Sequence, residues 1–134
     1  WSYLIDGDKR RKWLAAGEMP QAPGGEFTLT WRNDELTSPT GARPDGFSTE
    51  HSMKSRVVEM QPPHRVVFTW GFRGEAMDIG PGESTVEVVL TAAGGGTDLV
   101  LTHTGLPTRD SRKSHSEGWA FHLKNLAGLD LRPA

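Results

Sequence analysis

The sequence predicts an α+β fold in which a curved antiparallel β-sheet wraps around one long C-terminal helix, with short helices at the N-terminus. Two observations indicate this class. Segments that alternate apolar and polar residues follow one another between residues 26 and 105, whereas apolar residues at both ends of the chain recur at helical spacing. Strands and helices are therefore segregated along the chain, which is typical of α+β domains rather than of parallel sheets.

The N-terminal segment predicts two short helices. Trp1, Leu4 and Ile5 are spaced by about one helical turn, and an Asp-Gly-Asp sequence at residues 6–8 interrupts the pattern. Trp13 and Leu14 close the second helix, and residues 17–25 are rich in Gly and Pro, as turns are.

Residues 26–33 and 50–60 predict the first two strands. In the first, Phe27, Leu29 and Trp31 share one face, as in a half-buried strand. The second alternates less regularly, so its register stays open. Residues 34–47 are polar and rich in Pro and Gly, and they predict a loop with weak strand character.

The next three strands are more regular. The strand at residues 65–72 follows the turn at Pro62-Pro63, because proline cannot continue a sheet ladder, and residues 84–105 form a hairpin that turns at Gly94-Gly95-Gly96. The residues expected on their inward faces are Val66, Phe68, Trp70, Phe72, Val86, Val88, Leu90, Leu99, Leu101 and His103.

The last helix is expected to begin at Ser114 or Ser116, which could cap it, and to end near Leu129. Trp119, Leu123 and Leu126 form its apolar stripe, and His122 lies on the flank of that stripe. The charged residues at 109–113 predict a solvated linker, which would form a mouth or a gate.

The composition of the chain excludes several classes of function. A chain of 134 residues predicts a single domain over residues 1–134. A net charge of −2 and a pI near 6.2 give no indication of a nucleic-acid or anionic-membrane partner. With no Cys there are no disulfides and no thiolate chemistry, and no apolar run approaches the roughly 20 residues of a membrane span. We expect a cytoplasmic protein without a cofactor.

Four motifs together resemble the START/Bet v 1-like (SRPBCC) superfamily, in the branch similar to the activator of heat-shock-protein-90 ATPase. Two tryptophans bracket the N-terminal helices, at Trp1 and Trp13. The other three motifs are V-x-E-x-x-P-x-x-R-V-x-F-T-W at Val57–Trp70, G-T-x-L-x-L-T-H-x-G-L at Gly96–Leu106, and G-W-x-x-x-L-x-x-L at Gly118–Leu126. They follow in the family's order along nearly the whole chain, and they are structural rather than catalytic.

The resemblance implies a helix-grip fold, in which the sheet grips the C-terminal helix around an apolar cavity. It also implies that the family's first strand belongs before Trp1, so residues 1–134 are expected to lack that strand. Co-chaperones of the family carry a separate N-terminal domain that binds the chaperone. The sequence has no room for such a domain, which weakens an assignment to chaperone activation.

The histidines raise two chemical hypotheses. His103, His115 and His122 could approach one another, but their spacing is looser than zinc sites usually show, so we expect no metal. His115 and Glu117 could transfer protons beside His103 if a dry pocket shifted their pKa values. A carboxylate near a helix N-terminus is explained equally by the helix dipole, and we assign no catalytic residue.

We therefore expect the protein to bind an apolar or amphipathic small molecule between its sheet and C-terminal helix, without performing chemistry on it. A co-chaperone-like interaction module and a cyclase- or hydrolase-type enzyme are the alternatives, and a homodimer through a strand edge or the loop at residues 39–44 is a further expectation. The predicted cavity residues are Phe27, Leu29, Trp31, Phe68, Trp70, Phe72, Leu101, His103, Trp119, His122 and Leu123.

Overall fold

The computed structural model describes residues 1–32, 50–71 and 83–129. It confirms the α+β class and the helix-grip arrangement. The elements, in chain order, are α1 (Ser2–Ile5), α2 (Gly7–Arg10), β1 (Glu26–Arg32), β2 (Glu50–Gln61), β3 (Arg65–Trp70), β4 (Ser84–Ala93), β5 (Gly96–Thr104) and α3 (Arg109–Ala127).

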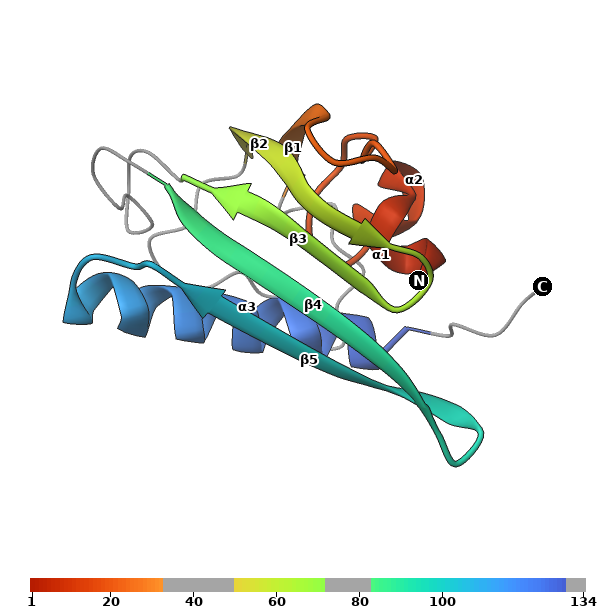
Figure 1. Ribbon diagram of the computed structural model, residues 1–134. Helices are drawn as coiled ribbons and strands as arrows, with labels where there is room; N and C mark the ends of the chain where they lie inside the picture. The colour runs from red at the N-terminus through yellow and green to blue at the C-terminus, as the bar shows by residue number, and fades with distance from the viewer. Residues whose placement is uncertain (33–49, 72–82, 130–134) are drawn as a thin grey trace.

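The five strands form one antiparallel sheet in the order β1-β2-β3-β4-β5, so each strand pairs with its neighbours in the sequence. The sheet twists, α3 runs along one of its faces, and α1 and α2 lie near the β1–β2 end (Figure 1). The predicted alternation is confirmed on this face. Its buried side chains include Phe27, Leu29, Val66, Phe68, Trp70, Val86, Val88 and Leu90.

An irregularity in β2 explains why its sequence did not fix a register. Val57 pairs with Phe68, but Glu59 pairs with Val67, so one extra residue lies between the two pairs. Such a bulge reverses the alternation along a strand. Met53, Ser55 and Val57 are consequently buried at odd positions, and the next inward residue is Met60 at an even position.

The β4–β5 hairpin turns at two residues rather than three. Ala93 pairs with Gly96, which leaves Gly94 and Gly95 as the loop. Their φ angles are +54° and +84°, and two successive positive φ values are the requirement of the type I′ turn that suits the twist of a hairpin. The tip extends away from the rest of the fold (Figure 1).

Helix α3 begins at Arg109, so its cap lies six residues before Ser114, the earliest predicted cap. Thr108 caps it: its hydroxyl accepts a hydrogen bond from the Ser111 amide at 3.0 Å, and the Thr108 amide donates to Ser111 Oγ at 3.1 Å. This reciprocal capping box satisfies amides that would otherwise lack partners. The prediction of a linker or gate at residues 109–113 was therefore wrong, because these residues form the start of α3.

The buried face of α3 is largely polar. It consists of Ser111, His115, Gly118, Trp119, His122 and Asn125. His122 is only 5% exposed and lies within this face, so its predicted flanking position was wrong. Leu123 and Leu126, which were predicted to define the stripe, are only partly buried against the core.

A buried arginine holds the N-terminal segment together. Arg10 is 1% exposed, and its guanidinium donates to the carbonyl oxygens of Ala15 at 3.0 Å, Leu4 at 2.8 Å and Ile5 at 3.4 Å. Burial lowers its pKa to about 10, against the opposing effect of Glu18 and Asp6. The hydrogen bonds link α1, α2 and the turn that follows into one unit.

Gly17 joins that unit to β1. Its φ is +117°, and a Cβ at this position would lie 1.9 Å from the Thr28 carbonyl oxygen. The neighbouring Ala16 exchanges backbone hydrogen bonds with Thr30, at 2.8 and 3.0 Å. The chain can approach β1 this closely only because residue 17 has no side chain.

Candidate functional site

The structure places the predicted cavity residues in two settings. Phe27, Leu29, Phe68, Trp70 and Trp119 belong to the hydrophobic core, and Leu101 and Leu123 are partly buried against it. The backbone of Trp31 pairs with His51 in the β1–β2 ladder. Phe72 lies outside the described residues.

The rings of Trp70 and Trp119 contact each other directly. Their centroids are 4.9 Å apart at an interplanar angle of 50°, a separation typical of packed aromatic pairs. Phe68 continues the row, 6.3 Å from Trp70, and Phe27 lies 6.0 Å from Phe68. At this end, α3 and the sheet are joined by packed aromatic rings.

A chain of hydrogen bonds runs through His103 beside these rings. Trp119 Nε1 donates to His103 Nδ1 at 3.0 Å, and because an indole N–H only donates, this imidazole carries its proton on Nε2. That proton is donated to Ser84 Oγ at 2.6 Å, and the Ser84 hydroxyl donates to the Trp70 carbonyl at 3.0 Å. Every proton in the chain has a defined acceptor.

This arrangement requires a neutral His103. A second ring proton would face the Trp119 N–H, donor against donor. Burial, with a smaller contribution from neighbouring His115, lowers the pKa of His103 to about 4. Since both ring nitrogens are engaged, the residue joins α3 to β4 and β5 and has no lone pair left for a reacting group.

His115 stands next to this chain with one nitrogen unused. The His103 and His115 rings meet edge to face, with centroids 5.2 Å apart. The Nδ1 of His115 donates to the Ser111 carbonyl at 2.7 Å, whereas its buried Nε2 has no hydrogen-bond partner. Burial lowers its pKa, against the effect of the Ser111 hydrogen bond. Among the three described histidines of this region, His115 retains the clearest unused acceptor.

His122 connects α3 to the N-terminal segment. Its Nδ1 donates to the Trp13 carbonyl at 2.9 Å, across 109 positions of the chain. Burial lowers the pKa of His122 to about 4, although the hydrogen bond to Trp13 acts in the opposite direction. The two histidines named as cavity residues therefore both act as structural connections of α3.

A pocket of about 400 Å³ lies farther along α3, toward its C-terminal end. Its walls come from three parts of the fold: the N-terminal segment, the β4–β5 hairpin and the last two turns of α3. The lining residues are Trp1, Ser2, Tyr3, Leu4, Trp13, Leu90, Thr97, Leu99, Leu123, Leu126 and Ala127.

Of the predicted cavity residues, only Leu123 lines this pocket. Helical spacing predicted that Trp1, Leu4 and Trp13 belong to helices, but it did not predict that they form a pocket wall. Their aromatic and apolar side chains recur on short helices that are too small to bury them alone, and this was the available signal. Leu99 and Leu126 were placed on inward faces but not in the site.

No metal site accompanies these residues: across residues 1–32, 50–71 and 83–129, no group of three or more His, Asp or Glu side chains is arranged to hold an ion. Within the same part of the chain, no helix is long and apolar enough to cross a membrane. Proton transfer by Glu117 gains no support, since Glu117 is exposed.

Several solved structures share the fold. The protein encoded by gene BPP1335 of Bordetella parapertussis is 33% identical, with a TM-score of 0.73 over 99% of this chain and 70% of that one. Protein CV1439 from Chromobacterium violaceum is 22% identical, with a TM-score of 0.71 over 98% of this chain and 87% of that one. CalU16 from Micromonospora echinospora is 21% identical, with a TM-score of 0.65 over 95% of this chain and 64% of that one. The last two show the fold alone.

Family membership follows from the sequence as a whole. No functionally curated protein matches the chain. The family model described as "Activator of Hsp90 ATPase homolog 1-like protein" matches residues 1–129, which is nearly the entire chain. The protein therefore belongs to the family of Activator of Hsp90 ATPase homolog 1-like proteins, as its four motifs predict.

Proposed function

We propose that the protein binds an apolar or amphipathic small molecule in the pocket between the β4–β5 hairpin, the N-terminal segment and α3, and that it performs no chemistry on it. The observation that carries this proposal is the pocket itself. Its volume of about 400 Å³ falls in the range of about 300–1,000 Å³ that is usual for small-molecule sites. Its walls are mostly Trp, Leu and Ala side chains.

The histidine geometry favours binding over catalysis. His103 uses both ring nitrogens, for Trp119 and Ser84, and His122 holds the Trp13 carbonyl. Neither residue lines the pocket. A general base has to reach the proton that it removes, and no His, Asp or Glu is among the described pocket residues.

Filling the pocket tests the proposal. Ala127 lines the pocket on an exposed turn of α3, so Ala127→Trp adds a ring there with little effect on the core. Ala120→Trp is the matched control, because Ala120 is exposed on the same helix and does not line the pocket. Titration with the neutral fluorophore N-phenyl-1-naphthylamine should show saturable binding that Ala127→Trp weakens by about tenfold or more and Ala120→Trp leaves unchanged. Absence of saturable binding, or equal weakening by both variants, would contradict the proposal.

We also propose a cytoplasmic location and a homodimer, both as expectations from sequence. Light scattering on the purified protein measures its mass directly, and a monomer at all concentrations would exclude the dimer. Of the two predicted contact regions, the loop at residues 39–44 lies outside the described residues. The edge of β5 carries Val100, which is 60% exposed.

A further inference from the structure

The charge of the pocket residues restricts what the pocket can hold. Among the described residues, its lining contains no Asp, Glu, Lys, Arg or His side chain. An ion transferred from water into an apolar site without an opposite charge loses its hydration and gains nothing equivalent. These lining side chains therefore offer no opposite charge to a carboxylate, sulfonate or phosphate group, or to an amine.

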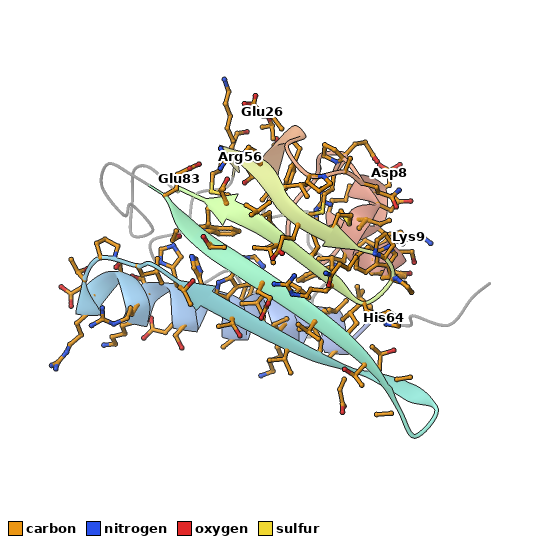
Figure 2. The ribbon with its side chains drawn as sticks, in the orientation of Figure 1. Asp8, Lys9, Glu26, Arg56, His64 and Glu83 are labelled. Atoms are coloured by element: carbon orange, nitrogen blue, oxygen red, sulfur yellow. The ribbon has the colours of Figure 1, made fainter. Side chains whose placement is uncertain are left out.

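Lys9 stands outside the described lining and interacts with two residues of it. Lys9 Nζ donates to Ser2 Oγ at 3.2 Å and stands 5.5 Å from the centre of the Tyr3 ring. Figure 2 shows Lys9 and Asp8 on the outer side of α2.

The two sides of the pocket carry different kinds of side chain. The N-terminal side presents the rings of Trp1, Tyr3 and Trp13, whereas the opposite side presents aliphatic side chains such as Leu99 and Leu123. Trp13 Nε1 already donates to the Tyr3 carbonyl at 2.7 Å, so Trp13 offers a ligand its ring and no hydrogen bond. Aromatic walls favour flat rings, which stack on them or meet them edge to face.

We infer that the pocket selects an uncharged, ring-containing molecule and discriminates against anionic ligands of the same shape. The inference rests on the proposed function and specifies its ligand class. Besides the indole N–H groups of Trp1 and Trp13, the side-chain polar groups of the described lining are the hydroxyl groups of Ser2, Tyr3 and Thr97. They suit a ligand with hydroxyl or carbonyl substituents.

A matched pair of probes tests the charge preference. N-phenyl-1-naphthylamine and 8-anilino-1-naphthalenesulfonate share the aryl-amine framework, and the second adds a sulfonate. At pH 7 the neutral probe should bind more tightly, by about tenfold or more. 1-Dodecanol, which is neutral and has no ring, should displace the neutral probe only weakly.

A charge placed at the rim should change this preference in a defined direction. Thr97 is exposed and lines the pocket, so Thr97→Arg should improve binding of the sulfonate and narrow the difference between the probes. Val100→Arg adds the same charge on the same strand but outside the lining, and it should leave the ratio unchanged. Thermal unfolding of both variants verifies that they remain folded.

The outcomes separate the two proposals. Equal affinity for both probes, or equal effects of the two arginines, would overturn the charge selection and leave small-molecule binding intact. If 1-dodecanol displaced the neutral probe with an affinity equal to that of the probe itself, the preference for rings would be overturned. If neither the probes nor 1-dodecanol bound the folded protein, the proposed function would fail, and the inference with it.

Discussion

At the scale of single residues, Trp119 connects α3 to the sheet in two ways. Its ring contacts Trp70, and its indole N–H donates to His103. At 8% exposure it is almost entirely removed from water. One side chain thus contributes both apolar packing and the hydrogen bond that fixes the protonation state of a buried histidine.

Truncation of this side chain should separate the two contributions. Trp119→Ala should lower the free energy of unfolding by about 3–5 kcal/mol, the usual cost of removing a buried aromatic ring. Trp119→Phe keeps a ring against Trp70 but removes the donor to His103, so it should cost less than Trp119→Ala. Urea unfolding of the three proteins provides the comparison, and a near-neutral Trp119→Ala would mean that α3 is not anchored here.

Individual residues also show what the sequence could and could not predict about the site. Alternation correctly placed Phe68, Trp70 and His103 on the inner face. It could not reveal that Trp70 and Trp119 touch, because this depends on how far α3 stands from the sheet. His122 was misplaced since hydropathy ranks histidine as polar, whereas a hydrogen bond to the Trp13 carbonyl allows its burial.

At the scale of elements, the start of α3 depends on its cap. Thr108→Ala removes the acceptor of the Ser111 amide and should destabilise the protein by about 1 kcal/mol. Ser114→Ala serves as the control, because the Ser114 hydroxyl bonds back to the Asp110 carbonyl within the helix and alanine is the better helix former. In thermal unfolding, the Tm of Thr108→Ala should lie below that of the wild type. The Tm of Ser114→Ala should equal or exceed that of the wild type.

Two glycines offer a test of how the N-terminal segment meets β1. Both have positive φ, but a Cβ at Gly17 would overlap the Thr28 carbonyl oxygen, whereas a Cβ at Gly24 meets nothing within 4 Å. Gly24→Ala should cost about 1–2 kcal/mol, for the backbone conformation alone. Gly17→Ala should cost distinctly more, and equal losses in chemical denaturation would show that the approach to β1 is not tight.

The elements themselves were largely predictable, and their ends were not. Regular alternation defined β3, β4 and β5. The bulge after Val57 obscured β2, because it changes which positions face inward. The capping pair Thr108 and Ser111 was present in the sequence, but a serine in place of the usual glutamate or glutamine makes it a weak signal.

At the scale of the whole molecule, the fold encloses several histidines in their neutral form. The pKa of His122 and that of His103 are lowered to about 4, and the pKa of His115 is lowered as well. The unfolded chain binds protons at the ordinary histidine pKa near 6.5, before the folded protein does. The contribution of these neutral histidines to the free energy of unfolding is thus fully present above pH 6.5. It is lost as the pH falls from about 6.5 toward 4.

Acid should therefore weaken the protein as the pH falls below about 6.5. For His122 alone, the change in pKa from 6.5 to about 4 corresponds to about 3 kcal/mol. His122→Asn keeps a donor near Nδ1 and should flatten the dependence of unfolding free energy on pH. His64→Asn is the control, since His64 is exposed on the turn between β2 and β3 (Figure 2). An unchanged pH profile in His122→Asn would contradict the assignment.

The pocket is a property of the whole molecule, and this is why the sequence did not reveal it. Its residues come from positions 1–13, 90–99 and 123–127. Local periodicity indicates which way each side chain faces within its own element. It contains no information on whether three such elements meet tightly or leave space between them.

The projecting tip of the β4–β5 hairpin has a practical consequence for experiments. The chain contains no cysteine, so a single cysteine at Ala93, which is exposed beside the turn, would be the one thiol available for labelling. A dye attached there would sit on the hairpin that supplies Leu90, Thr97 and Leu99 to the pocket. A second introduced cysteine on α3 would accept the partner dye, and the pair would report the distance between helix and hairpin in solution.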